Sequence, residues 1–197
     1  FDKIEKLNTN NFSNIQDVEF MHICIPFSKN FEKSIIQLTK KFNPDGIIIH
    51  STISPNNTKK LQAKLDLPII YSATRGVHKR MLKDLKRYTK FFAVYDYAPN
   101  SKWASRTFKN KLKKCGVKTK QMSQPITLEL AKVVCDTSYY GWLINFAQMS
   151  AMIAKKQNAQ TDLAIPPIAS FGWGGAPEAL RGTSIVRTAS VPPCCAC

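Results

Sequence analysis

Three polar side chains follow a run of three isoleucines in the first third of the chain. The isoleucines, Ile47–Ile49, are β-branched and favour a buried strand. Directly after them stand His50, Ser51 and Thr52. In a parallel sheet, ligands bind beyond the carboxyl ends of the strands, so we expect these side chains to face a crevice, where an imidazole can exchange protons. The alternative is that Ser51 and Thr52 only end the strand and bond to local backbone.

Two further segments are expected at the same edge of the sheet. Pro26-Phe27 follows the β-rich segment 18–25, and Thr74-Arg75-Gly76 follows the apolar segment 67–71. A guanidinium group makes bidentate hydrogen bonds to the paired oxygens of a phosphate or carboxylate. Arg75 beside Gly76 is therefore a candidate for substrate binding. The alternative for Arg75 is an ordinary arginine in a surface turn.

A third candidate is a polar stripe near the start of a long apolar helix. Glu129, Lys132 and Asp136 have the spacing i, i+3, i+7, which places them on one helix face. Lys132 at a crevice mouth can position a substrate or shuttle protons. The alternative is an ordinary helix ion pair between Lys132 and Asp136, which is common and weak.

The elements that must position these residues alternate between strands and helices. We expect strands at 18–25, 46–50, 67–71, 91–95 and near Val117, and helices at 31–42, after Ser54-Pro55, around 81–88, over 104–115 and over about 125–156. Ser54 is expected to cap its helix, with Pro55 at the first position. This alternation predicts an α/β fold, Rossmann-like and doubly wound, with a mainly parallel sheet followed by a long helix and an irregular tail.

Composition divides the chain into two parts. It has 197 residues with 29 Lys plus Arg against 13 Asp plus Glu, and no lysine follows Lys156. We expect a partial domain over residues 1–156 and a low-order tail over 157–197, with a shifted reading frame as one explanation for the tail. The formal charge of +16 attracts phosphate-bearing partners, but it does not distinguish nucleic acid from a nucleotide or an anionic membrane.

The six cysteines form two groups. Cys24, Cys115 and Cys135 lie in patterned segments and are expected to be small core residues of a protein in a reducing compartment, which predicts a cytoplasmic location. The other three, Cys194, Cys195 and Cys197, lack the partner pair that a zinc site needs, so no metal site is predicted. The longest apolar run, 139–154, is too short and too often interrupted for a membrane span, so no membrane partner is expected.

These features together resemble the later part of the NAD-binding domain of the nucleotide-sugar dehydrogenases, the family of UDP-glucose and GDP-mannose dehydrogenases. The 6-phosphogluconate and 3-hydroxyacid dehydrogenases are more distant relatives. The resemblance covers about residues 18–154. It is carried by the strand that ends at Pro26, the His-Ser-Thr-Ile-Ser-Pro segment 50–55 and the stripe Glu129, Lys132 and Asp136.

The resemblance implies roles at the matching positions. Ile25, Pro26 and Phe27 match a stretch along the cofactor, and Ser51 and Thr52 match a pair near the nicotinamide of NAD. Lys132 matches a lysine that contacts the substrate and its reacting hydroxyl, with Asp136, where the family usually has asparagine, holding it. NADP is not excluded, because the residue that reads the ribose is missing.

The departures from the family pattern are large. No glycine-rich diphosphate-binding turn is present, the glutamate expected after the 67–71 strand is replaced by the segment 72–76, and the domain with the catalytic cysteine is missing. Gly172–Pro177 resembles that cysteine loop only faintly. We therefore expect an N-terminally incomplete fragment with weak or no NAD affinity and no turnover by itself. The apolar helix 126–154 is expected to pack against a second copy or the missing domain.

Two other functions stay open. The first is a non-enzymatic binding module, in which the basic face 79–90 binds nucleic acid or a phosphorylated partner. A solvated lysine face is favoured over nucleic-acid binding there, since few aromatic residues are interleaved. The second is a Rossmann-like scaffold that has lost its chemistry.

Overall fold

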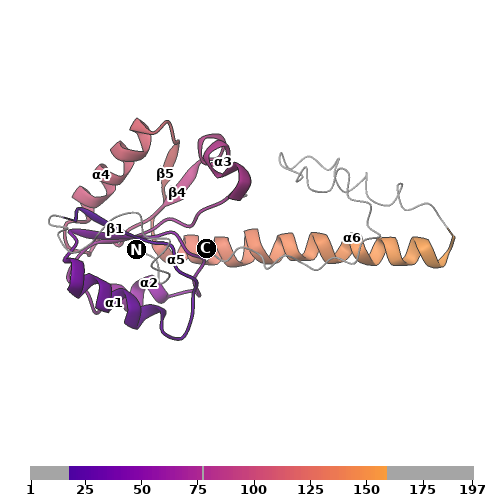
Figure 1. Cartoon of the computed structure of the whole chain (residues 1–197), viewed down its shortest axis with the longest axis horizontal. Coiled ribbons are helices and arrows are strands. Elements are labelled where there is room, and N and C mark those ends of the chain that lie inside the picture. The colour runs from indigo at the N-terminus through magenta and orange to yellow at the C-terminus, as the bar shows by residue number, and fades with distance from the viewer. Residues whose placement is uncertain (1–17, 77, 159–197) are drawn as a thin grey trace, which may run out of the picture. The chain divides into compact units, whose positions relative to one another are not determined.

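The computed structural model describes residues 18–76 and 78–158 (Figure 1). They fall into two compact units, one up to Val133 and one from Val134 onward, and each is described by itself. The predicted tail lies outside the described residues from position 159 on, together with the Gly172–Pro177 loop and the cysteine group 194–197.

A three-stranded parallel sheet forms the centre of the first unit. Its strands, β1 (Phe20–Ile23), β2 (Gly46–Ile49) and β3 (Ile69–Tyr71), lie in the order β1-β2-β3. Every residue of β2 is buried, as the unbroken apolar run predicts for a central parallel strand. The first residue of β2 is Gly46. A larger residue would not fit there, because a Cβ atom would lie 2.8 Å from the Phe20 ring.

The next two strands depart from the predicted continuous parallel sheet. β4 (Lys90–Phe92) and β5 (Thr119–Gln121) pair with each other in parallel. Among the described residues, the strand pairing recorded between the β4 segment and the central sheet is an antiparallel bridge between Tyr71 and Ala93, directly after β4. Consequently β4 begins, rather than ends, beside the carboxyl end of β3, which brings Lys90 to that edge.

Helices cover both faces of the central sheet, which confirms the predicted α/β fold. Within the first unit they are α1 (Phe31–Phe42), α2 (Asn57–Gln62), a 3₁₀ turn (His78–Arg80), α3 (Met81–Arg87), α4 (Ser101–Lys114) and α5 (Pro125–Leu130). One core cluster joins α1 and α2 to one face through Phe31, Ile35 and Leu61. A second joins α4 to the other face through Ala104 and Phe108 (Figure 1).

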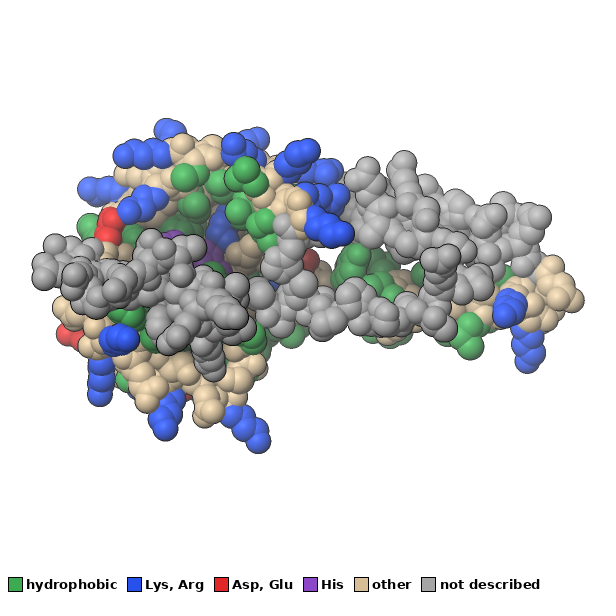
Figure 2. Space-filling model, viewed as in Figure 1, with side chains coloured by type: hydrophobic (Ala, Val, Ile, Leu, Met, Phe, Trp, Pro, Cys, Tyr) green, Lys and Arg blue, Asp and Glu red, His purple; other side chains and the backbone are tan. Residues whose placement is uncertain are grey.

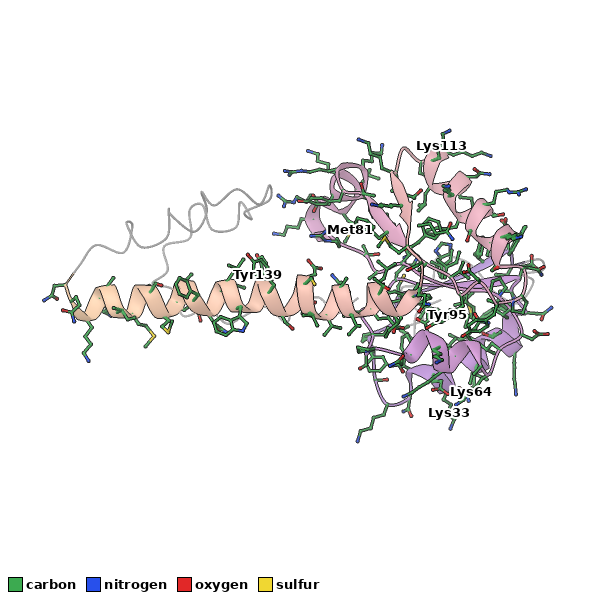
Figure 3. The ribbon with its side chains drawn as sticks, turned by 180° about the vertical axis from the view of Figure 1, so that it is seen from behind. Lys33, Lys64, Met81, Tyr95, Lys113 and Tyr139 are labelled. Carbon is green, nitrogen blue, oxygen red and sulfur yellow. The ribbon has the colours of Figure 1, made fainter. Side chains whose placement is uncertain are left out.

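Charged side chains project from both helical layers of the first unit. Lys33 and Lys64 project from the layer of α1 and α2, and Lys113 projects from the end of α4 on the opposite side (Figure 3). Apolar stripes of α1 and α4 face the sheet, so the lysines take the outward positions.

The start of α2 corrects one prediction. Ser54 does not cap the helix with Pro55 at its first position; Asn56, in a left-handed conformation, precedes the first helical residue, Asn57. The Ser54 carbonyl instead accepts hydrogen bonds from the backbone N–H and the side-chain amide of Asn57. The chain thus makes a turn before the helix, and the helix begins later than the Ser-Pro pair suggests.

The long helix contains an interruption that the sequence pattern did not predict. After α5, residues Ala131–Ser138 form a π-helical segment, and α6 (Tyr139–Lys156) continues from it. The 3.6-residue spacing that placed Lys132 and Asp136 on the face of Glu129 therefore ends at Leu130. A π segment of this kind often occurs at functional sites.

One burial prediction is wrong: Cys24, Cys115 and Cys135 are exposed rather than in the core. Most large apolar side chains of α6 are exposed in the single chain, with Trp142 at 70% and Met152 at 73% of their full surface, whereas Ala147 and Ala151 are buried. Among the residues that the structure describes, no helix has the length and hydropathy that crossing a bilayer requires.

Candidate functional site

The carboxyl ends of β1 and β2 are tied together by a serine hydroxyl. Ser51 is 1% exposed, and its Oγ donates to the Ile25 carbonyl at 2.6 Å. The backbone N–H of His50 donates to the Ile23 carbonyl at 2.9 Å. Ser51 therefore fixes the backbone at the start of the segment Ile25, Pro26 and Phe27. Thr52, half-buried, follows at the same edge.

His50, the residue after β2, meets His22 of the neighbouring strand β1. His50 Nδ1 lies 3.1 Å from the Ser72 carbonyl oxygen, and His50 Nε2 lies 2.9 Å from His22 Nδ1. A carbonyl can only accept, so Nδ1 of His50 carries the proton and its Nε2 accepts from His22. The neutral His22 ring then has its second nitrogen, Nε2, unprotonated. His22 is exposed, so this nitrogen is a possible proton acceptor at the edge of the site.

Both imidazoles are held neutral near pH 7. Burial lowers the pKa of His50 to about 3, and the positive charge of Lys90 and the neighbouring His22 add to the effect. The pKa of the exposed His22 is lowered as well, first because neighbouring groups partly desolvate its ring and then by the charges of Lys111 and Lys90. The predicted proton exchange at His50 is therefore unfavourable at neutral pH, and the outer ring, His22, is better placed for it.

A buried lysine reaches the same sheet edge from β4, which runs antiparallel to β3. Lys90 begins β4 and is 7% exposed. Its Nζ donates to the Ser72 carbonyl at 3.1 Å and to Thr74 Oγ1 at 3.2 Å. The sequence interpretation placed Lys90 at the end of the basic helix face 79–90. However, α3 ends at Arg87, and Lys90 points into the site.

The pKa of Lys90 is lowered to about 8, chiefly by burial. The thiol of Cys24 partly offsets this, whereas the charge of Lys132 lowers the pKa further. The positive charges of Lys132 and Lys90 therefore influence each other. Both charges attract a phosphate, a carboxylate or a developing alkoxide.

Glu129 is a structural anchor, not a member of the site. Its side chain is fully buried. One carboxylate oxygen accepts from the Asn56 backbone N–H at 2.6 Å, and the other accepts from the Thr58 N–H at 2.9 Å and the Thr58 hydroxyl at 2.5 Å. These donors belong to the first turn of α2 and the residue before it, where N–H groups lack helical partners. Glu129 thereby fixes α5 to α2 and sets the position of Lys132, three residues later.

The predicted substrate segment is only partly assembled. Thr74 Oγ1 accepts from Lys90, so Thr74 belongs to the cluster. Arg75 is exposed and its guanidinium lies 5.7 Å from the centre of the Tyr88 ring, a cation–π contact with α3's flank. Gly76 has a φ of 144°, and a Cβ atom there would lie 3.0 Å from Asp84 Cβ. Gly76 therefore allows the chain to turn against α3.

The structure brings together Ser51, Thr52, Thr74 and the 25–27 segment at one sheet edge, and the charge of Lys132 acts on Lys90 there. Asp136 belongs to the second unit. Sequence reasoning missed Lys90, although a lysine directly before the apolar pair Phe91-Phe92 was an available sign. Among the described residues, no group of three His, Cys, Asp or Glu side chains is arranged to hold a metal.

Comparison with known proteins identifies the fold. The chain is similar to the solved UDP-D-ManNAc dehydrogenase from Pyrococcus horikoshii, with a TM-score of 0.58 and 20% identity over 86% of this chain and 41% of that one. It is also similar to the UDP-N-acetyl-mannosamine dehydrogenase from Staphylococcus aureus, with a TM-score of 0.56 and 16% identity over 78% of this chain and 41% of that one. No family model matches the sequence, and no curated protein is significantly similar to it.

At these identities the likeness shows the fold alone. The predicted Rossmann-like α/β architecture with a long helix is confirmed. The chain spans 41% of the length of each of these solved dehydrogenases. Their activity therefore does not pass to this chain by similarity.

Proposed function

We propose that this chain carries the later part of an NAD-binding domain in an oxidoreductase of the nucleotide-sugar dehydrogenase type. The observation that supports this most is the cluster at the carboxyl edge of β1, β2 and β3. There Ser51 holds the 25–27 segment, and Lys90 sits buried within the electrostatic reach of Lys132. Carboxyl edges of this kind bind dinucleotides in doubly wound folds.

In the proposed reaction, a sugar alcohol or another hydroxyl substrate loses a hydride to the nicotinamide and a proton to a base. NAD supplies the hydride acceptor, and NADP stays open. Ile25, Pro26 and Phe27 would lie along the cofactor, with Ser51 and Thr52 near its nicotinamide end. Since Ser51 Oγ already donates to the Ile25 carbonyl, its part is to hold that segment in place.

Lys132 would orient the substrate and stabilise the negative charge that develops on its oxygen as the proton leaves. Asp136 would hold Lys132, and Thr74, Arg75 and Gly76 would face the substrate. Lys90 adds a second positive charge, because its ammonium group is fixed by the Ser72 carbonyl and Thr74. The pair of lysines suits a substrate that carries phosphate, such as a nucleotide-linked sugar.

The exposed apolar side chains of α6 support a further part of the proposal. Tyr139, Trp142, Met149 and Met152 are among its exposed large residues. A second copy or a further domain packing on α6 would bury them, as large exposed apolar patches usually mark interfaces.

The activity is tested on the product of the complete reading frame that contains this sequence. NADH formation with a panel of UDP- and GDP-sugars is followed by absorbance. Lys132→Ala should lower kcat by about 100-fold or more, since one well-placed electrostatic contact contributes that much to a transition state. The control is Lys155→Ala, an exposed lysine in the last turn of α6, which should leave kcat unchanged. Equal turnover in both variants would remove the catalytic assignment and favour a scaffold without chemistry.

Cofactor binding is tested on the chain itself by NMR titration with NAD. Shifts should concentrate at residues 25–27, 51–52 and 72–76, with an affinity in the millimolar range or weaker, since no diphosphate-binding turn is present in the sequence. A micromolar affinity would contradict this expectation. Shifts confined to another surface would overturn the placement of the cofactor.

A further inference from the structure

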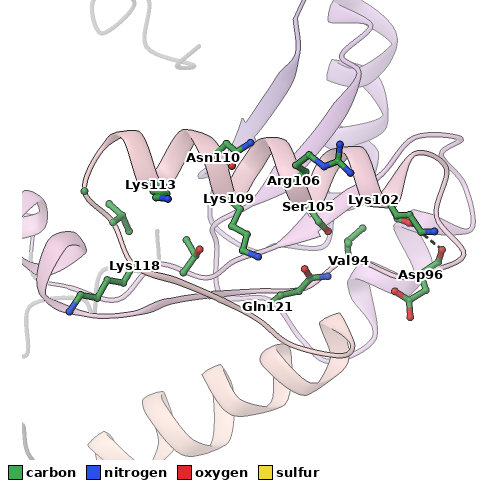
Figure 4. A pocket seen from close by; sticks show the side chains of 14 residues that line it. Val94, Asp96, Lys102, Ser105, Arg106, Lys109, Asn110, Lys113, Lys118 and Gln121 are labelled. Atoms are coloured by element: carbon green, nitrogen blue, oxygen red, sulfur yellow. Dashed lines mark hydrogen bonds between the residues drawn. The ribbon is translucent and has the colours of Figure 1, made fainter.

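We propose that a groove between α4 and β5 binds a linear oligophosphate, a small anion with several phosphate groups in a row. The groove has a volume of about 860 Å³ and is lined by one face of α4, the turn after it and β5 (Figure 4). It shares no lining residue with the cluster of Ser51, Lys90 and Lys132. The proposal therefore stands independently of the dehydrogenase assignment.

The groove is strongly cationic. Its charged lining residues are Lys102, Arg106, Lys109, Lys113, Lys118 and Asp96. Five cations against one carboxylate leave a net formal charge of +4 on a single small surface. Figure 2 shows Lys and Arg side chains gathered over the region of α4 and α3. A groove that concentrates one sign of charge raises the local concentration of oppositely charged ligands.

Four of the five cations form a row along α4. Lys102, Arg106, Lys109 and Lys113 recur at intervals of four, three and four residues, which places them on one helix face. At 1.5 Å of rise per residue the row extends about 16 Å. Lys118 joins them from the segment that leads into β5. A row of this length matches several anionic groups in series better than a single phosphate.

Among residues 18–76 and 78–158, no ion pair is recorded for a cation of this row. The ion pair recorded for α4 there joins Lys111 to Glu19, and Lys111 does not line the groove. Like charges spaced i, i+4 on a helix destabilise it. The uncompensated row is therefore costly for the isolated protein and becomes favourable when an anion binds.

A buried hydroxyl beside the groove points to a ligand independently of charge. Ser105 lies on α4 between the cations, is 9% exposed and lines the groove (Figure 4). Its Oγ is buried and has no hydrogen-bond partner in the described structure. A buried polar group without a partner is unfavourable. A rotation of the Ser105 side chain toward the groove would let its hydroxyl donate to a phosphate oxygen.

The chemistry of the lining favours an oligophosphate over nucleic acid. No aromatic residue lines the groove, whereas proteins that hold single strands usually stack bases on aromatic rings. A volume of about 860 Å³ also falls within the range of small-molecule sites. Lysine and arginine with a serine hydroxyl recognise phosphate oxygens without requiring a base.

The proposal is tested by calorimetric titration of the chain with inorganic tripolyphosphate. The groove variant is K109Q/K113Q. Its control is K111Q/K114Q, which removes the same charge from the same helix but from side chains outside the groove. The groove variant should weaken binding by about 10-fold or more, because it removes two charge-assisted contacts. The control should change it by less than about 2-fold, through long-range screening only.

Three results would overturn the proposal. One is the absence of tripolyphosphate binding by the unmodified chain at low salt. Another is an equal loss in both variants, which would indicate general attraction by net charge. The third is that an oligothymidylate of about twelve nucleotides binds more tightly than tripolyphosphate and that the groove variant, but not the control, loses this oligothymidylate binding. NMR shifts at the groove amides on addition of tripolyphosphate should accompany the expected result.

Discussion

Lys90 and Lys109 are lysines in the same unit with opposite surroundings. Lys90 is buried, donates two hydrogen bonds and has a pKa lowered to about 8. Lys109 lines an open groove, and the structure records no ion pair for it among the described residues. The cluster at the sheet edge thus has its charges fixed by hydrogen bonds that the fold itself makes, whereas the groove presents charges that the fold does not use.

The two lysines illustrate different roles of charged groups in a protein, one in folding and one in binding. A buried charged group contributes to or opposes folding directly, because its hydration is lost when the chain folds. An exposed row of charges changes stability little and acts mainly on ligands that approach it. Substitutions near the sheet edge should therefore alter stability, and substitutions in the groove should alter binding.

The largest effect is expected at Glu129. Glu129→Ala removes the carboxylate that accepts hydrogen bonds from Asn56 and Thr58, and leaves the buried N–H and hydroxyl of Thr58 unsatisfied. The free energy of unfolding should fall by about 3–5 kcal/mol, as observed when one partner of a buried charged contact is deleted. Urea unfolding followed by circular dichroism measures the change.

Glu32 provides the matched comparison for Glu129. Its carboxylate pairs with Lys64 at the surface, and Lys64 is 55% exposed. Glu32→Ala should therefore lower the free energy of unfolding by about 1 kcal/mol or less. Similar losses for the two glutamates would contradict the view that buried charges are part of the fold and surface charges are not.

Much of the architecture was predictable because it depends on local pattern. The run Ile47–Ile49 predicted β2, and the apolar spacing over 31–42 predicted α1 with the bounds observed. Glu129 looked like one member of a surface stripe, because its partners lie 71 and 73 residues away along the chain. Periodicity carries no information about contacts at that separation.

The site was predicted less completely than the fold. Ser51 was expected to face a crevice; it lies just after β2, and its hydroxyl is used within the protein. Lys90 was assigned to a helix face because it ends a lysine-rich segment. Its burial depends on the antiparallel bridge between Tyr71 and Ala93, which turns β4 back toward the carboxyl edge. Strand direction of this kind cannot be read from composition.

An intermediate effect is expected from the titration of Lys90. Its pKa is about 8 in the folded state and ordinarily about 10.5. Below pH 8 both states are protonated and the buried charge opposes folding. As pH rises above 8 the folded state loses the proton first, so stability rises by up to about 1.4 kcal/mol per pH unit. Burial and the charge of Lys132 are the causes of the lowered pKa, and Cys24 opposes them.

Lys90→Met isolates this contribution. The difference in the free energy of unfolding between the unmodified chain and Lys90→Met should shift in favour of the unmodified chain from pH 8 to 9.5. The measurement stops there because the pKa of Tyr95 is raised to about 12 by burial, so tyrosine ionisation begins to favour the unfolded state near pH 10. A flat difference for Lys90 would mean that its ammonium group is well hydrated.

The smallest effect is expected in the groove. In K109Q/K113Q the free energy of unfolding should stay within about 0.5 kcal/mol of the unmodified chain at low salt and rise rather than fall, because one repulsive i, i+4 pair is removed. Added salt should erase even this gain, since it screens exposed charges. Tripolyphosphate should raise the melting temperature of the unmodified chain and not that of the variant, because a ligand stabilises only the state that binds it. A large loss of stability in the variant would show instead that these lysines serve the fold, and the contrast with Lys90 would fail.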